Sequence, residues 1–196
     1  MPSVRSRVPY PLKSKAKRPM KDVMIDLETL GTTADAVILS IGAVKFNLES
    51  GDIDDKAFYA SVSVESNLDM GRRISESTLN WWFDQTPEAR QVFREPKQTL
   101  ENSLRELIDW FEHDQRRVWS NGADFDLPML AHAFTQLGLT TPWQFWNSRC
   151  VRTYRALPAA SSVPKLQNDH NALRDAVNQA KHVQAIYAAM VRKVPA

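Results

Sequence analysis

Four carboxylates and one histidine have the types and spacing that could do chemistry in this chain. Asp26 and Glu28 stand two residues apart at the end of an apolar run, Asp126 follows about a hundred residues later, and His170 precedes Asp175 by five residues. Carboxylates repel one another, so a protein that gathers four of them needs a cation to hold them. Hard oxygen ligands favour Mg²⁺ or Mn²⁺ over zinc. Because two such ions held by carboxylates commonly cut phosphodiesters, the pattern indicates metal-assisted phosphodiester hydrolysis.

Three predicted strands would position the first pair of acids. Apolar runs at 23–27 and 36–46 and an alternating segment at 57–64 predict a meander, with a turn at Gly51. Side chains two residues apart on a strand point to the same face. We therefore expect Asp26 and Glu28 to face one metal site from the first strand.

The remainder of the chain alternates predicted helices with short strands. Helices are expected at 75–82, from about 86, at 100–111, from 126 to Gly138, and at 172–192. Short strands are expected at 118–120 and within 145–150, and a loop at 159–168. Strands followed by mixed helices and strands predict an α/β fold, with a mixed central sheet flanked by helices. We place this single domain at residues 21–194.

His170 and Asp175 cannot share a face of one regular helix, because residues five apart differ by about 140° around the axis. We expect His170 on the loop and Asp175 in the first turns of the last helix. A loop histidine can take a proton from a metal-bound water near pH 7. Spacing alone does not separate Asp126 from Asp124, since an acid at a helix start also has a capping role.

Composition limits the class of protein. The chain has 196 residues, of which 43% are apolar and 24% charged, as in one globular domain. The single Cys150 excludes an internal disulfide and a cysteine zinc cluster. We see neither a run of roughly 18 apolar residues nor a secretory signal, so we expect a cytoplasmic protein without a membrane segment.

The formal net charge of +2 conceals an asymmetry. Residues 1–20 carry six bases and no acid, and the remainder carries 19 bases against 23 acids. We expect the first segment to be a basic, disordered tail. It could contact nucleic-acid phosphates, be a transit-like segment, be an upstream extension before Met20, or be a solvated tail with no dedicated role.

Three motifs give the chain a family resemblance. Asp26-Leu27-Glu28-Thr29, Phe125-Asp126 and the span from His170 to Asp175 resemble the motifs of the DEDDh 3′→5′ exonucleases of the ribonuclease-H-like superfamily. The resemblance spans about residues 20–190 and favours Asp126 over Asp124. Residues 78–82, 85–90, 120–128 and 145–149 are also similar to phage exonuclease A, exodeoxyribonuclease VIII-like and small exoribonuclease-like proteins. One departure is Asn121-Gly122, where many members have His-Asn.

The resemblance implies a ribonuclease-H-like fold and an enzyme that releases nucleoside monophosphates from the 3′ end of single-stranded DNA. Two Mg²⁺ or Mn²⁺ ions would flank the terminal phosphodiester, and His170 would be the general base. The implied metal ligands are Asp26, Glu28, Asp126 and Asp175. Thr29 and Leu30 would line the pocket for the terminal nucleotide, and a homodimer is compatible with the family.

Further contacts to nucleic acid are expected from aromatic and basic residues. Trp81 and Trp82 are adjacent on a predicted helix, so we expect one to be buried and one to face the groove, where it could stack on a base. Arg149, Arg152 and Arg155 follow a spacing of three, which on a helix would present them together to phosphates or to solvent.

Other functions stay open at this stage. RNA could be the substrate in place of DNA, since only contacts to a 2′-hydroxyl would separate them. A catalytically silent module that binds nucleic acid is a second class, although intact acids at every motif argue against it. A hydrolase of nucleotides or dinucleotides is a third.

Overall fold

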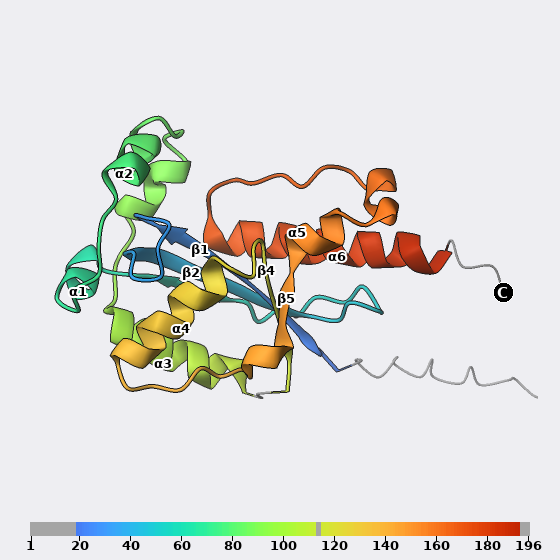
Figure 1. Ribbon diagram of the computed structural model, residues 1–196, viewed down its shortest axis with the longest axis horizontal. Coiled ribbons are helices and arrows are strands. Elements are labelled where there is room, and N and C mark those ends of the chain that lie inside the picture. The colour runs from blue at the N-terminus through green and yellow to red at the C-terminus, as the bar shows by residue number, and fades with distance from the viewer. Residues whose placement is uncertain (1–18, 113–114, 193–196) are drawn as a thin grey trace, which may run out of the picture.

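A five-stranded mixed sheet forms the centre of the protein. The computed structural model describes residues 19–112 and 115–192 (Figure 1), so residues 1–18 of the expected tail lie outside the described residues. The strands follow the order β3-β2-β1-β4-β5; β1, β2 and β3 are antiparallel, and β4 and β5 run parallel to β1. The strands are β1 Asp22–Thr29, β2 Ile38–Phe46, β3 Phe58–Ser61, β4 Arg117–Ser120 and β5 Ser148–Cys150. This arrangement confirms the predicted mixed sheet and its initial meander.

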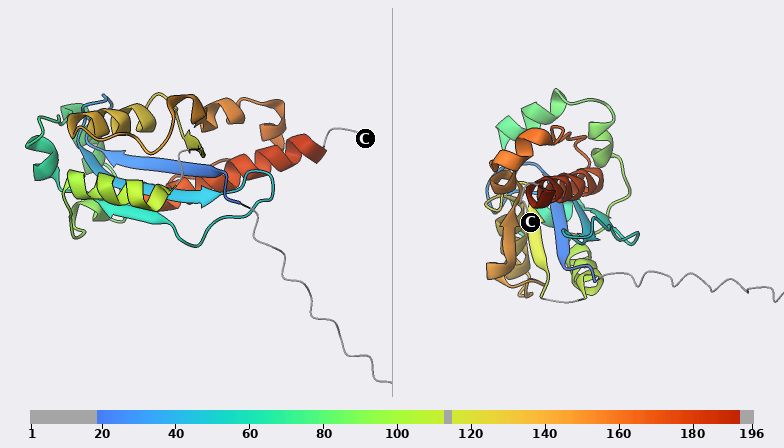
Figure 2. Two further views of the ribbon diagram at one scale, coloured as in Figure 1. Left: turned by 90° about the horizontal axis from the view of Figure 1, so that it is seen from below. Right: turned by 90° about the vertical axis from the view of Figure 1, so that its right-hand side faces the viewer.

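Helices cover both faces of the sheet. The α-helices are α1 Val64–Leu68, α2 Glu76–Phe83, α3 Leu100–Phe111, α4 Asp126–Gln136, α5 Val151–Arg155 and α6 Ala172–Arg192. The 3₁₀ helices are η1 Ala89–Phe93, η2 Phe145–Asn147 and η3 Pro158–Ser162. Figures 1 and 2 show α6 on one side of the central strands and α3 and α4 on the other. No helix within the described ranges is long and apolar enough to span a bilayer.

The alternation of side chains along β1 assigns each of its residues to one of these faces. Val23, Ile25 and Leu27 are buried in the cluster formed with α3 and α4. Met24 points the other way, into the cluster that includes Ala176, Ala180 and Val183 of α6. At period two, Asp26 and Glu28 follow Met24 onto the α6 face.

Three expectations about individual elements were wrong. The third strand ends at Ser61 and does not reach residue 64, because Ser63 accepts a hydrogen bond from Ser66 N (3.2 Å) and starts α1. The helix expected from residue 86 is the short 3₁₀ helix η1. Arg149 lies in β5, paired in parallel with Trp119, so it does not share a helical face with the arginines of α5.

Candidate active site

The four predicted acids lie together where β1, α4 and α6 meet. Asp26 and Glu28 are on β1, Asp126 is the first residue of α4, and Asp175 is in the first turn of α6. Asp126 is 2% exposed, and its Oδ1 accepts a hydrogen bond from the backbone of Leu27 (3.1 Å). Asp124, in contrast, is exposed to solvent. The position beside β1 therefore belongs to Asp126.

A glycine on β2 allows α6 to approach the sheet at this point. Gly42 pairs with Asp26 in the antiparallel ladder. A Cβ on Gly42 would lie 2.2 Å from the carbonyl carbon of Ala172 and 2.3 Å from the nitrogen of Leu173. The absent side chain thus leaves room for the start of α6, which carries Asp175 three residues later. Sequence reasoning assigned no role to Gly42, although a glycine inside a strand often marks a close backbone approach.

A buried glutamine supports the first acid of the cluster. Gln179 is 1% exposed, and its Nε2 donates a hydrogen bond to Asp26 Oδ1 (2.7 Å). Its Oε1 has no hydrogen-bond partner among the described residues. Gln179 follows Asp175 by four residues, so both side chains lie on the same face of α6. Gln179 was not predicted from the sequence, although its spacing from Asp175 was an available signal.

The histidine stands on the loop before α6, as predicted. His170 has φ +52°, a left-handed conformation that histidine adopts more readily than most residues. Its ring meets Trp81 edge-on at 5.0 Å between centroids. Ligand atoms of Glu28, His170 and Asp175 all lie within 4.8 Å of one another. Asp175 Oδ1 accepts the backbone N–H of Asp169 (2.8 Å), which ties this loop to the helix.

Burial makes the acid cluster hard to ionise without a cation. Burial, then the charges of Asp175 and Asp126, raises the pKa of Glu28 to about 8, and burial raises the pKa of Asp126 to about 7. The pKa of Asp26 is well above its ordinary range because of burial and the charges of Asp126 and Glu28. Burial also raises the pKa of Asp175. None of these acids forms an ion pair within the described part of the chain. The charge of Arg152 lowers the pKa of Asp126 and that of His170 lowers the pKa of Asp175, but burial outweighs both. An oxygen-rich cluster of this kind fits a divalent cation.

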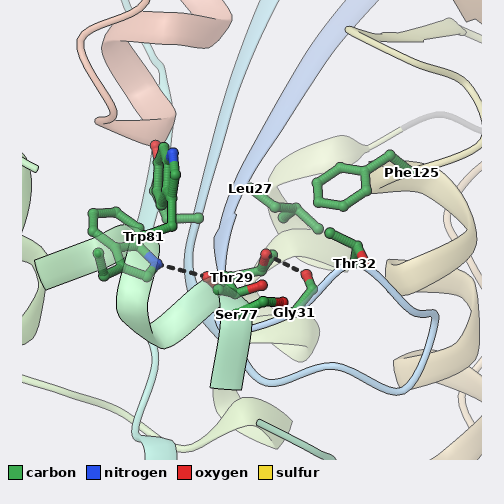
Figure 3. Close-up of a pocket in the computed structure, with 10 residues that line it drawn as sticks. Leu27, Thr29, Gly31, Thr32, Ser77, Trp81 and Phe125 are labelled. Atoms are coloured by element: carbon green, nitrogen blue, oxygen red, sulfur yellow. Dashed lines mark hydrogen bonds between the residues drawn. The ribbon is translucent and has the colours of Figure 1, made fainter. Parts of the chain in front are cut away.

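A cavity of about 350 Å³ opens beside the cluster and shares Glu28 with it. Figure 3 shows Phe125 and Trp81 on opposite sides of this cavity, with Thr29 and Ser77 between them. A slot between two aromatic side chains suits a flat, stacked base. The full lining comprises Leu27, Glu28, Thr29, Gly31, Thr32, Ser77, Thr78, Trp81, Trp82 and Phe125.

The two tryptophans differ in exposure, as expected. Trp82 is 1% exposed, and its Nε1 donates to the carbonyl of Thr29 (2.8 Å), whereas Trp81 is 41% exposed. Leu30 is 3% exposed in the cluster around Trp82 and does not line the cavity, so Leu27 contributes the apolar lining on β1. The guanidinium of Arg149 donates to the carbonyls of Trp146 and Ser148. The substrate contacts expected of these residues stay predictions.

The sequence matches a known protein family over most of its length. The family described as a 3′-5′ exoribonuclease Rv2179c-like domain matches residues 21–187. The chain belongs to this family. The family match identifies the chain as a 3′→5′ exonuclease, an enzyme that hydrolyses phosphodiesters.

The chain is also similar to individual relatives and solved structures. An exodeoxyribonuclease of Enterobacteria phage T4 is 27% identical, over 68% of this chain and 70% of the relative. E. coli exonuclease I in complex with a dT13 oligonucleotide superposes with a TM-score of 0.61 at 16% identity, covering 87% of this chain. The nuclease domain of 3′hExo bound to rAMP, a DEDDh family member, superposes with a TM-score of 0.51 at 16% identity, over 87% of this chain and 90% of that domain. These structures confirm the ribonuclease-H-like fold. The chain spans 41% of the exonuclease I chain.

Proposed function

We propose that the protein is a divalent-metal-dependent 3′→5′ exonuclease that releases nucleoside monophosphates from single-stranded DNA. The observation that carries the proposal is a cluster of four acids, three of them buried and Asp26 half-buried, which reaches through Glu28 a cavity between two aromatic side chains. One unpaired base fits such a slot, and its 5′ phosphate would then lie toward Glu28, the acid that the cavity shares with the cluster.

Asp26, Glu28, Asp126 and Asp175 would hold two Mg²⁺ or Mn²⁺ ions. When bound, these ions supply activation of the attacking water and stabilisation of the leaving 3′ oxygen. The water oxygen would bond to phosphorus while the bond from phosphorus to the 3′ oxygen of the penultimate nucleotide breaks. That oxygen would take a proton from solvent, which leaves a 5′ monophosphate and a strand shortened by one nucleotide. Trp81 and Phe125 would orient the terminal base. The hydrogen bond from Trp82 Nε1 to the carbonyl of Thr29 would fix the position of these two lining residues.

His170 would take the proton of the attacking water. One of its ring nitrogens lies within 4.8 Å of a carboxylate oxygen of Glu28 and of Asp175, so it can reach a water between these acids. The same distance would allow a nitrogen ligand, but hard ions prefer the four oxygens already present. His170→Ala should therefore slow hydrolysis by about 10²–10⁴-fold with metal affinity retained. A loss of Mn²⁺ affinity in calorimetry would make His170 a ligand.

RNA is the second candidate substrate, and the exoribonuclease description of the matched family favours it. The 27% identical phage exodeoxyribonuclease favours DNA. We place DNA first because that relative is matched over most of its length. The expected homodimer and cytoplasmic location stay predictions.

A gel assay tests the proposal. Single strands of DNA and RNA of matched sequence, labelled at the 5′ end, are incubated with Mn²⁺, Mg²⁺ or EDTA. We expect a metal-dependent ladder that shortens from the 3′ end, with DNA cut faster. Faster cutting of RNA would select the second substrate. Binding of both strands without cleavage would support a silent module.

A further inference from the structure

Charge is divided unevenly between the two parts of the domain. Residues 149–192 contain seven lysines and arginines against two acids, whereas residues 21–148 contain eleven against twenty-one. The first of these segments forms α5, η3 and α6, and both α5 and η3 pack against α6. In Figure 1 these elements lie together along one side of the molecule. A basic surface therefore adjoins the acidic site.

The exposed bases of this surface are available to an anion. Arg152, Arg155, Lys165 and Lys181 are all exposed. None of them forms an ion pair with any described residue, although the charge of Arg152 also acts on Asp126 and lowers its pKa. Residues 149–168 contain no acid at all. Unpaired bases of one sign on neighbouring elements create a local positive potential.

The surface begins at the active site and leads away from it. The guanidinium carbon of Arg152 lies 3.1 Å from the point that a Cβ on Gly122 would occupy, in the loop before Asp126. Further out, Lys165, Lys181 and His182 line an open depression of about 390 Å³. Lys181 follows Asp175 by six residues, roughly 9 Å along a helix axis. A stacked strand that rises about 3.4 Å per nucleotide covers that length in about three nucleotides.

We propose that this surface binds the backbone phosphates of the single strand upstream of the terminal nucleotide. Arg155, Lys165 and Lys181 form its outer part, and Arg152 stands at its inner end. The inference rests on the proposed function, because it places the remainder of the same substrate. Contacts of this kind read charge and not base sequence, so the surface increases affinity for long strands without regard to sequence.

A second basic feature offers a rival path. Arg90 and Arg94 border a cavity of about 340 Å³ that is also lined by Phe83 and Phe93, and this cavity shares Trp82 with the proposed nucleotide pocket. Its segment is less favourable for a polyanion, because residues 76–95 contain four acids against these two bases. The α5–α6 surface is therefore the better path for phosphates.

A triple substitution tests the surface by binding alone. Arg155→Gln, Lys165→Gln and Lys181→Gln are combined, and Arg90→Gln with Arg94→Gln is the matched control. Affinity for a fluorescent dT20 strand is measured by anisotropy in EDTA between 50 and 200 mM salt. Each phosphate contact on a single strand contributes about 0.7 to the slope of log affinity against log salt, so the triple variant should lose about 2 from this slope. The control should keep the wild-type slope.

A short substrate separates this inference from the proposed function. With Mn²⁺, the p-nitrophenyl ester of thymidine 5′-monophosphate should be hydrolysed equally well by the wild type and the triple variant, within about twofold. An unchanged dT20 slope in the triple variant, or a larger loss in the Arg90 and Arg94 control, would overturn the proposed path. If the wild type hydrolyses neither ester nor strand, the proposed activity fails, while the anisotropy slopes still decide whether the surface binds phosphates.

Discussion

Both faces of β1 pack apolar side chains at Met24 and before it, but at the C-terminal end of the strand one face stays apolar and the other carries two acids. Toward α3 and α4, Val23, Ile25 and Leu27 are fully or almost fully buried in an apolar core. Toward α6, the same strand places Asp26 and Glu28 in an environment that raises the pKa of both. The first face gains stability from apolar burial, whereas the second gathers charges that repel one another. One strand can therefore stabilise the fold through its apolar face. Its other face carries acids whose mutual repulsion is relieved when a cation binds.

Substitutions at two adjacent positions of β1 should have the largest effects, one on activity and the other on stability. Asp26→Asn removes a ligand charge, and we expect hydrolysis of single strands to fall by at least about 10⁴-fold, or about 5 kcal/mol. Its metal-free melting temperature should stay the same or rise, because repulsion among the acids is relieved. Ile25→Ala should instead destabilise the fold by about 2–5 kcal/mol in denaturant unfolding. A metal-free Asp26→Asn protein that unfolds like Ile25→Ala would break the comparison.

A methyl group on β2 should disturb the acidic face without touching an acid. Gly42→Ala would force α6 away from the sheet, since its Cβ would overlap the backbone of Ala172. We expect a loss of about 1–3 kcal/mol in stability and roughly 100-fold in activity, because Asp175 is displaced. Chemical denaturation and steady-state kinetics measure the two effects. Ala43→Gly, next to it on the apolar face, should lower stability while the residual folded protein keeps its specific activity.

The buried glutamines of α6 provide a matched pair with a smaller effect. Gln179 donates to Asp26, whereas Gln184 donates to the carbonyls of Asn47 and Asp52. Loss of a residue that orients a metal ligand typically costs about 10–100-fold in metal affinity. Calorimetric titration with Mn²⁺ should show this loss for Gln179→Leu and wild-type affinity for Gln184→Leu. Equal Mn²⁺ affinity in both variants would remove Gln179 from the site.

The acidic face should also give the metal-free protein a pH dependence. The folded pKa of Glu28 is raised from its ordinary 4.5 to about 8, so the folded state binds more protons than the unfolded state between these values. Stability from this group is complete below about pH 4.5 and is lost as the pH rises through about 8. The melting temperature in EDTA should therefore fall between pH 5.5 and 8.5, and saturating Mn²⁺ should reduce the fall. A melting temperature that rises across this range would contradict the sign.

The periodic parts of the fold and the charged parts of the site were predictable from the sequence. The meander, α3 and α6 have long apolar patterns, and the acids and His170 have distinctive types and spacing. α1 was missed because residues 57–64 have the alternation of a strand. The strand ends because Ser63 caps the helix by accepting a hydrogen bond from Ser66 N, a contact that the alternation does not reveal. Arg149 fell both within the short strand predicted at 145–150 and in a helical spacing with later arginines. Its pairing with β4 confirms the strand and contradicts the shared helical face.

The residues that support the site were harder to find, because their chemical types are ordinary. Gly42 acts by lacking a side chain, and its neighbour across the fold is Ala172, about 130 positions away. Gln179 looks like one polar residue among several on α6. Its spacing of four from Asp175 is a weak signal, and its distance to Asp26 shows which acid it supports. Such roles depend on tertiary contacts, which local patterns do not contain.

Electron paramagnetic resonance of the Mn²⁺-loaded protein tests the central claim most directly, because it reports whether the acidic face holds two ions. With thymidine 5′-monophosphate present, the wild type should show a spin-coupled pair of Mn²⁺ ions about 3.5–4 Å apart. The pair should be absent from Asp26→Asn and retained in His170→Ala. A wild-type spectrum of isolated ions only, or a coupled pair that survives in Asp26→Asn, would contradict the assignment of these acids to a two-ion site.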